Sequence, residues 1–187
     1  MKNETDAVTN SNTIAIVGAT GKTGARVLSQ LQELGYSTRG LSRNSEYYFD
    51  WQDRASWEKS LQGVSTAYVT YYPDLAIPQA ESDIRAFVDL AISLGLKHTV
   101  LLASRGEEGA QRAEYVVKQR GLDWNIVRAS WFMQNFSESF MIEGILNGEL
   151  MLPADDTVEP FVDVDDIADV AVAALTRSAL RNRVFEV

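Results

Sequence analysis

The chain has 187 residues, 45% of them hydrophobic, with a net charge of −9, no cysteine and one histidine. This length and composition suit one folded domain with a core, and the missing cysteines exclude disulfides, thiolate metal sites and cysteine nucleophiles. The acidic balance argues against nucleic acid as a partner, because phosphate backbones require clustered Lys and Arg side chains.

The polar N-terminal stretch has no apolar centre typical of a secretory signal, and no apolar run is long enough to span a bilayer. We therefore expect a disordered tail at residues 1–12, a single domain at 13–187 and no membrane partner. A cytoplasmic location fits the absence of cysteine.

The first predicted strand, Thr13–Val17, runs into the glycine-rich stretch "GATGKTG" at residues 18–24. A triphosphate loop, G-x-x-x-x-G-K-[ST], would require glycine where Ile16 stands. Apolar residues then recur at helical spacing up to Gly35, so the turn opens a helix whose free amides face a ligand. Strand, glycine turn and helix together predict a dinucleotide loop.

Each glycine of this G-x-x-G-x-x-G turn has its own predicted role. Gly18 allows the sharp exit from the strand, Gly21 lets the backbone approach a pyrophosphate, and Gly24 lets the helix pack on the sheet. The alternative is a tight strand-to-helix turn without a ligand.

The remaining elements alternate between strands and helices. Strands are expected at 37–42, 47–49, 67–71, 98–103, 124–127 and 184–187, and helices at 54–62, 80–94, 110–120 and 166–176. This order predicts an α/β fold of the Rossmann type, with a doubly wound, mostly parallel sheet and ligands outside the carboxyl ends of its strands. The irregular segment 135–162 is expected to form a lid or a pocket wall.

The end of the second strand indicates which dinucleotide is bound. An acidic residue there would hold a ribose 2′-hydroxyl, whereas this chain has Ser42 and Arg43. A guanidinium can bind two oxygens of a 2′-phosphate, so NADP(H) is favoured over NAD. The alternative is a solvated surface arginine.

A proton donor is harder to place. The Ser-Tyr-Lys apparatus of short-chain dehydrogenases needs Tyr and Lys four residues apart, whereas Tyr115 and Lys118 are three apart, and Tyr115 falls on the face opposite the apolar one. The easiest redox chemistry is then hydride delivery to a carbon that is already electrophilic.

The aromatic residues Phe132, Phe136 and Phe140 follow the sixth strand at i, i+4 and i+8. This spacing fits the core stripe of a helix and equally a pocket wall beside the ligand crevice. We take Trp131 and Met133 as pocket candidates.

Three other polar groups have structural interpretations. His98 is expected to be an exposed residue at the start of a strand. Asp163, Asp165 and Asp166 precede a helix, where carboxylates cap free amides. Glu107 and Glu108 are expected in a surface loop, where either could act as acid or base.

Six blocks of sequence carry a resemblance to a known family. They are "GATGKTG" at 18–24, "LSR" at 41–43, "FDW" at 49–51, "LLASRGEEG" at 101–109, "VRASWFMQNFSE" at 127–138 and "PFVDVDDIADVAVAALT" at 160–176. In this order they resemble the NmrA-like atypical short-chain dehydrogenase/reductases, in particular the branch that contains festuclavine and agroclavine dehydrogenases.

The resemblance implies a set of site residues. The implied cofactor contacts are Gly18, Thr20, Gly21, Lys22, Thr23, Gly24, Ser42 and Arg43, with adenine near Asp50 and Trp51. The implied catalytic residues are Ser104, Tyr71 and Trp131, and the implied substrate contacts are Trp131, Phe132, Met133 and Phe136.

Two features depart from the family. Its members continue past the strand equivalent to "VFEV" into a C-terminal part that closes over the substrate, whereas this chain stops at Val187, and proline usually occupies the position of Ala129. The expectation is a more open pocket, a pocket completed by a second subunit of a homo-oligomer, or an altered activity.

Three functions remain open at this point. The first is an NADPH-dependent reductase of a small apolar electrophile, such as an iminium, a quinone or an enone, in secondary metabolism. The second is a cyclase or isomerase without a redox step, and the third is an NADP-sensing regulator without catalysis.

Overall fold

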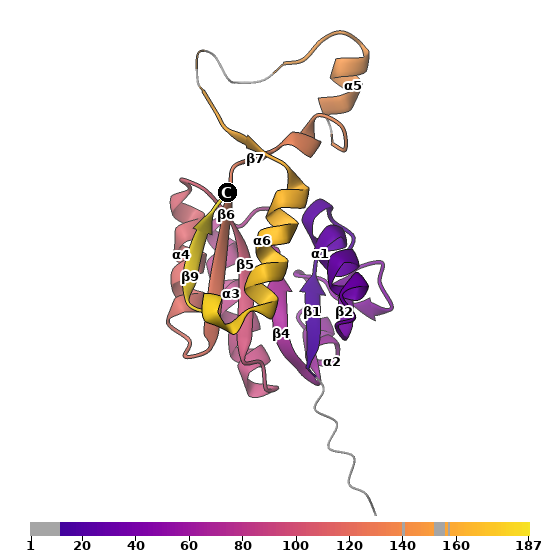
Figure 1. Ribbon diagram of the computed structural model, residues 1–187. Coiled ribbons are helices and arrows are strands. Elements are labelled where there is room, and N and C mark those ends of the chain that lie inside the picture. The colour runs from indigo at the N-terminus through magenta and orange to yellow at the C-terminus, as the bar shows by residue number, and fades with distance from the viewer. Residues whose placement is uncertain (1–11, 140, 152–155, 157) are drawn as a thin grey trace, which may run out of the picture.

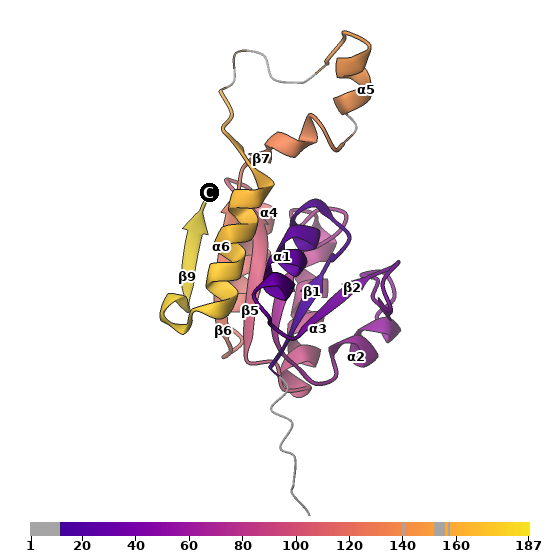
Figure 2. The same ribbon diagram turned by 45° about the vertical axis from the view of Figure 1, so that its right-hand side comes forward.

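The computed structural model describes residues 12–139, 141–151, 156 and 158–187. The predicted tail therefore lies outside the described residues, except for Asn12. Figures 1 and 2 show a body of sheet and helices from which one segment projects. Within the described part of the chain, no helix has the length and apolar character needed to cross a membrane.

Seven parallel strands form the main sheet, in the order β3-β2-β1-β4-β5-β6-β9. The strands are β1 (Thr13–Val17), β2 (Thr38–Ser42), β3 (Tyr47–Tyr48), β4 (Val64–Val69), β5 (His98–Ser104), β6 (Asp123–Ala129) and β9 (Arg183–Glu186). The order reverses between β1 and β4, which confirms the doubly wound prediction and places the ligand crevice above these two strands.

Helices cover both faces of the sheet, because strands buried on both faces must be shielded from water. The helices α1 (Lys22–Glu33) and α6 (Val164–Thr176) pack on one face. The helices α2 (Ala55–Leu61), α3 (Pro78–Ser93) and α4 (Glu108–Lys118) pack on the other. Figure 1 shows α1 and α6 side by side in front of the sheet.

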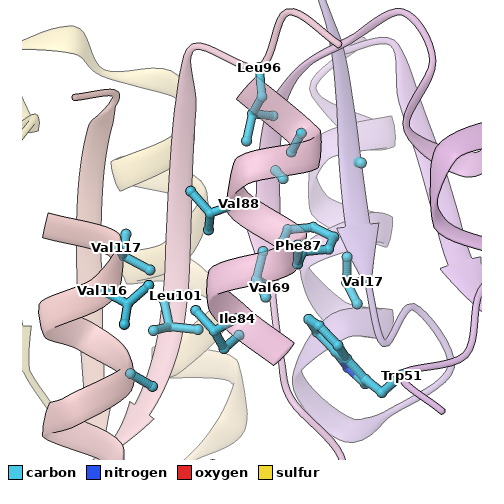
Figure 3. Packing of buried hydrophobic residues seen from close by; sticks show 14 of the residues in the cluster. Val17, Trp51, Val69, Ile84, Phe87, Val88, Leu96, Leu101, Val116 and Val117 are labelled. Atoms are coloured by element: carbon cyan, nitrogen blue, oxygen red, sulfur yellow. The ribbon is translucent and has the colours of Figure 1, made fainter. Parts of the chain in front are cut away.

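The larger core lies between the sheet and α3. Figure 3 shows Phe87 and Ile84 of α3 directed at Val69 of β4, with the Trp51 ring beside them. Phe49 and Trp57 complete an aromatic cluster, and the ring centroids of Trp51 and Phe87 are 5.3 Å apart. This cluster fixes the loop after β3 against the end of the sheet.

A projecting segment follows β6 at the carboxyl edge of the sheet (Figures 1 and 2). It contains β7 (Trp131–Phe132), a 3₁₀ turn (Met133–Asn135), α5 (Met141–Leu146) and β8 (Phe161–Val162), and β7 pairs with β8. Of the two alternatives for Phe132, Phe136 and Phe140, the core stripe of one helix is excluded, because Phe132 enters this strand pair; Phe140 itself lies outside the described residues.

Two polar contacts join the projecting segment to the body. The Gln134 amide donates to the Asp163 carboxylate at 2.7 Å and accepts from the Val164 amide. Arg26 of α1 pairs with Glu138 at 2.8 Å. The base of the segment is therefore held at the start of α6 and beside α1.

Candidate functional site

The glycine turn between β1 and α1 depends on Gly18. Its φ is +82°, a conformation that favours glycine, and a Cβ there would lie 2.1 Å from Thr70 Oγ1. The Thr70 hydroxyl in turn donates to the Val17 carbonyl at 3.0 Å. The turn thus brings the ends of β1 and β4 into direct contact.

The two later glycines of the turn differ in surroundings. A Cβ at Gly24 would lie 2.2 Å from the Gly18 carbonyl oxygen, so Gly24 allows α1 to pack on the turn. At Gly21 the nearest atom to a Cβ is the same oxygen at 3.3 Å. A side chain at Gly21 is therefore less crowded than one at Gly24, and the approach of a pyrophosphate to Gly21 stays a prediction.

The first turn of α1 presents backbone amides without a side-chain cap. Gly21 is its N-cap, no side chain caps it, and no acidic residue lies in its first turn. The first amides of a helix have no partner within the helix, and the helix dipole places positive potential there. This terminus is suited to bind an anionic group.

Two cavities meet at the glycine turn. One has a volume of about 640 Å³ and the other about 250 Å³. They share Gly18, Gly21, Thr70, Tyr71 and Tyr72. An elongated ligand can therefore extend from one cavity into the other across the turn.

The smaller cavity ends at β2 and contains most of the predicted cofactor residues. Its lining includes Thr20, Ser42, Arg43, Asp50 and Trp51. The Arg43 guanidinium lies 5.1 Å from the centre of the Tyr72 ring, and no ion pair among the described residues includes it. A cation without a carboxylate partner at the end of β2 is available to an anionic ligand.

Trp51 is a fixed wall of this cavity. Its side chain is nearly buried, with 7% of the residue exposed, and its indole N–H donates to the Thr70 carbonyl at 3.0 Å. The ring centroids of Trp51 and Tyr71 are 4.8 Å apart.

The larger cavity holds Lys22 and Thr23 of the loop together with all three predicted catalytic residues, Tyr71, Ser104 and Trp131. Parallel strands end at one edge of a sheet, which explains why Ser104 of β5 and Tyr71 after β4 meet there. The sequence had suggested that Tyr71 lies in the fourth strand. This strand ends at Val69, so Tyr71 belongs to the loop after it.

The aromatic candidates divide between the cavity and other surroundings. Trp131 and Phe132 line the larger cavity. Met133 is half exposed and outside this lining, and the Phe136 ring instead packs on Phe161 at 5.0 Å. The strand pair β7–β8 and the following 3₁₀ turn point these two side chains elsewhere. The structure adds Asn135, Tyr72 and Asp74, which no sequence pattern had identified.

Tyr71 has a buried polar partner that sequence reasoning also missed. Its hydroxyl donates to Asp83 of α3 at 2.8 Å, and Asp83 also accepts from Arg54 at 2.6 Å. Burial and the hydrogen bond to Asp83 both raise the pKa of Tyr71. Burial pushes the pKa of Asp83 upward, but the hydrogen bonds from Arg54, Tyr71 and Gln79 outweigh it and lower that pKa.

Tyr115, Asp163, Glu107 and Glu108 all lie outside the two cavities at the glycine turn. Tyr115 is exposed, as expected, and lies outside both cavities. The Asp163 carboxylate accepts from the Asp165 amide at 2.8 Å, which confirms its capping role. Glu107 is the N-cap residue of α4 and Glu108 its first residue, and neither borders the two cavities.

The expectation of an exposed His98 was wrong. Only 2% of the residue is exposed, since β5 is a central strand and the turn before β9 covers its start. The His98 ring lies 3.0 Å from Asn125 and contacts the Arg181 guanidinium. Burial and the nearby Arg181 charge lower the pKa of His98 to about 4.

No family model matches the chain. It is 32% identical over 194 residues to an agroclavine dehydrogenase from Claviceps fusiformis, which covers 91% of this chain and 65% of that protein. The similarity extends over nine tenths of this chain, on a sheet of this topology. The chain is thus similar to a dehydrogenase along almost its whole length, and it shares the fold of short-chain dehydrogenase/reductases. It spans less than two thirds of this relative's length.

Solved structures show the same fold as this chain. A superfamily protein from Agrobacterium tumefaciens with bound NAD matches with a TM-score of 0.70 and 15% identity, over 94% of this chain and 77% of the other. The quinone oxidoreductase QOR2 of Escherichia coli, complexed with NADPH, matches with a TM-score of 0.72 and 17% identity, over 93% and 68%. The Rossmann-type fold is thereby shown.

Proposed function

We propose that the chain is an NADPH-dependent reductase that delivers hydride to a small, largely apolar electrophile. The observation that carries this proposal is the pair of cavities that meet at the glycine turn, one ending at Arg43 and the other at Ser104. The agroclavine dehydrogenase supports the reductase activity and a substrate from secondary metabolism, and the NADPH complex of the quinone oxidoreductase supports the cofactor.

The residues at the turn fit a dinucleotide. Gly21 leaves room for a pyrophosphate, and the uncapped amides at the start of α1 would bind its oxygens. At the far end of the smaller cavity, Arg43 and Ser42 would hold a 2′-phosphate, beside Asp50 and Trp51 for the adenine. When bound, the nicotinamide supplies a hydride.

The larger cavity would orient the substrate. Trp131 and Phe132 present apolar surface, and Ser104 presents a hydroxyl at the end of β5. The Tyr71 hydroxyl already donates a hydrogen bond to Asp83, and Tyr115 lies outside the larger cavity. A substrate that needs no strong general acid, such as an iminium, a quinone or an enone, suits this arrangement, and positioning supplies most of the rate.

The test uses the selectivity of Arg43. Replacing Arg43 by alanine removes a charge-assisted contact to the 2′-phosphate, so NADPH binding should weaken by about 1.5 to 3 kcal/mol. NADH binding should stay unchanged, because NADH lacks this phosphate. Isothermal titration with both dinucleotides measures the two affinities.

The matched control is Arg85→Ala, which removes an exposed guanidinium of α3 outside both cavities. This variant should bind both dinucleotides as the unmodified chain does. Equal weakening of NADPH and NADH by Arg43→Ala, or no weakening, would contradict the assignment of NADPH.

Turnover separates the proposed reductase from the other two functions. A reductase consumes NADPH in step with its substrate, which absorbance at the nicotinamide band follows. Product formation without loss of NADPH would instead indicate a cyclase or isomerase. Tight NADPH binding without turnover of any iminium, quinone or enone would favour a regulator.

A further inference from the structure

Tyr71 occupies a junction between cavities. It lines the two cavities at the glycine turn and also a third of about 710 Å³, on the side of α2 and α3. Asp83 borders only the third cavity. The ring of Tyr71 therefore faces the proposed ligand space, whereas its hydroxyl is directed away from that space toward α3.

The acceptor of this hydroxyl is firmly held. Asp83 is only 5% exposed, and its carboxylate accepts from Arg54 at 2.6 Å, from Gln79 at 3.0 Å and from Tyr71 at 2.8 Å. A buried carboxylate with several donors is fixed in orientation and stays ionised. It accepts a hydrogen bond from the phenol, which keeps its own proton, and has no proton to give to the phenol.

We propose that Asp83 is a positioning residue that fixes the Tyr71 ring as the wall shared by the dinucleotide and substrate cavities. This inference rests on the proposed function. Tyr71 then acts through its ring face, held between Asp83 on one side and the Trp51 ring, 4.8 Å away, on the other. Its hydroxyl takes no part in proton transfer to the substrate.

The sequence position of Asp83 gave no hint of this role, since a single acidic residue in a helix is usually solvated. Another acidic residue of α3, Asp89, has the solvated surroundings that are usual for such a residue. Asp89 has a half-exposed side chain and pairs with the partly buried Arg120. Asp89→Asn is therefore a matched control for Asp83→Asn on the same helix.

The first experiment observes the Tyr71 ring directly by ¹⁹F NMR of the full chain labelled with 3-fluorotyrosine. Loss of one signal in Tyr71→Phe assigns Tyr71. Asp83→Asn should shift and broaden this signal in the absence of dinucleotide, and Asp89→Asn should leave it unchanged. An unchanged Tyr71 signal in Asp83→Asn would overturn the inference.

The second experiment measures NADP⁺ affinity in a double-mutant cycle. Asp83→Asn and Tyr71→Phe should each raise the Kd by about fivefold, and the double variant should raise it no further, because the first change weakens and the second removes the same hydrogen bond. Independent, multiplicative effects would contradict a shared role. Tyr71→Phe needs no change to the buried carboxylate, so it tests the contact even if Asp83→Asn fails to fold.

Failure of the proposed function gives a different result. If no NADP⁺ binds to the unmodified chain, the reductase proposal fails, and the ¹⁹F signal still decides whether Asp83 fixes the ring. Once a substrate is available, Tyr71→Phe should raise the KM for NADPH by about fivefold, as it raises the Kd, and should lower kcat by less than this factor. A loss of a hundredfold, about the least that a general acid contributes, would assign proton donation to the hydroxyl and overturn the inference.

Discussion

Two hydroxyl groups, of Ser104 and Tyr115, differ in their access to the proposed substrate. Ser104 borders the larger cavity, whereas Tyr115 is 64% exposed on the outer face of α4. We expect Ser104→Ala to lower kcat/KM by about tenfold to a hundredfold, and Tyr115→Phe to leave it within about twofold. Steady-state rates of both variants test this, and a large loss confined to Tyr115→Phe would restore a tyrosine mechanism.

His98 predicts a dependence of stability on pH. Its pKa is about 4 in the folded chain against an ordinary 6.5, so the unfolded chain binds a proton first as the pH falls. The contribution of neutral His98 is complete above pH 6.5, declines as the pH falls toward 4 and is then lost. Between pH 7 and 5 the free energy of unfolding should fall by about 2 kcal/mol from this group.

Urea unfolding at several pH values measures the effect of His98. Asn125, Arg181 and Asp123 are the polar groups that act on the ring. His98→Gln should therefore remove most of the slope between pH 6.5 and 5. A slope that persists in this variant would show that other groups cause it.

At the scale of elements, two glycines of the turn from β1 to α1 have different roles: Gly24 serves packing, and Gly21 serves the proposed binding of the dinucleotide. A Cβ at Gly24 would lie 2.2 Å from a backbone oxygen, so Gly24→Ala should lower the free energy of unfolding by about 1 to 3 kcal/mol. At Gly21 a Cβ would lie 3.3 Å from the same oxygen, a tight contact that a shift of a few tenths of an ångström relieves, and φ is −83°, which any residue adopts. Gly21→Ala should stay folded but lose at least tenfold in NADPH affinity, because its methyl group occupies phosphate space.

Urea unfolding and NADPH titration of both glycine variants provide the comparison. Each variant is the control for the other, since both add one methyl group to the same turn. Wild-type NADPH affinity in a folded Gly21→Ala protein would contradict the cradle.

The strands of the main sheet and the helices that cover it were largely predictable from the sequence, whereas the segment after β6 was not. The β-branched run Thr13–Val17 reflects a strand buried on both faces, and the helical spacing of α1 and α3 reflects burial of one face, so each leaves a pattern in the sequence. The segment after β6 had a helical pattern of phenylalanines but forms β7 and a 3₁₀ turn. Pairing with β8, whose residues lie 30 positions further along the chain than their partners in β7, overrode the local spacing.

At the scale of the whole molecule, Glu114 joins α4 to the last two strands of the sheet. It is almost fully buried, its two oxygens accept from Arg128 at 2.8 Å each, and Lys118 donates at 3.0 Å. Arg128 of β6 also pairs with Glu186 of β9. Burial favours a higher pKa for Glu114, but these hydrogen bonds outweigh it and lower the pKa.

Glu114→Gln should therefore destabilise the fold. Removing the carboxylate leaves the Arg128 charge partly buried with only Glu186 as its partner, at a cost of about 3 kcal/mol. Glu108→Gln, an exposed position on the same helix, should change stability by less than about 0.5 kcal/mol. Urea unfolding measures the free energy of unfolding of the two variants, and equal values would contradict the prediction.

The sequence alone determined the fold class, the glycine turn and the cation at the end of β2, because each depends on residues adjacent along the chain. The spacing of Gly18, Gly21 and Gly24 and the position of Arg43 are local properties of one strand-turn-helix unit. Only the tertiary structure decided which distant side chains meet. It buried His98 under a turn 83 residues away and paired Tyr71 with Asp83. It also separated Met133 and Phe136 from the larger cavity. Such contacts depend on how strands and helices pack, and they leave no periodic pattern in the sequence.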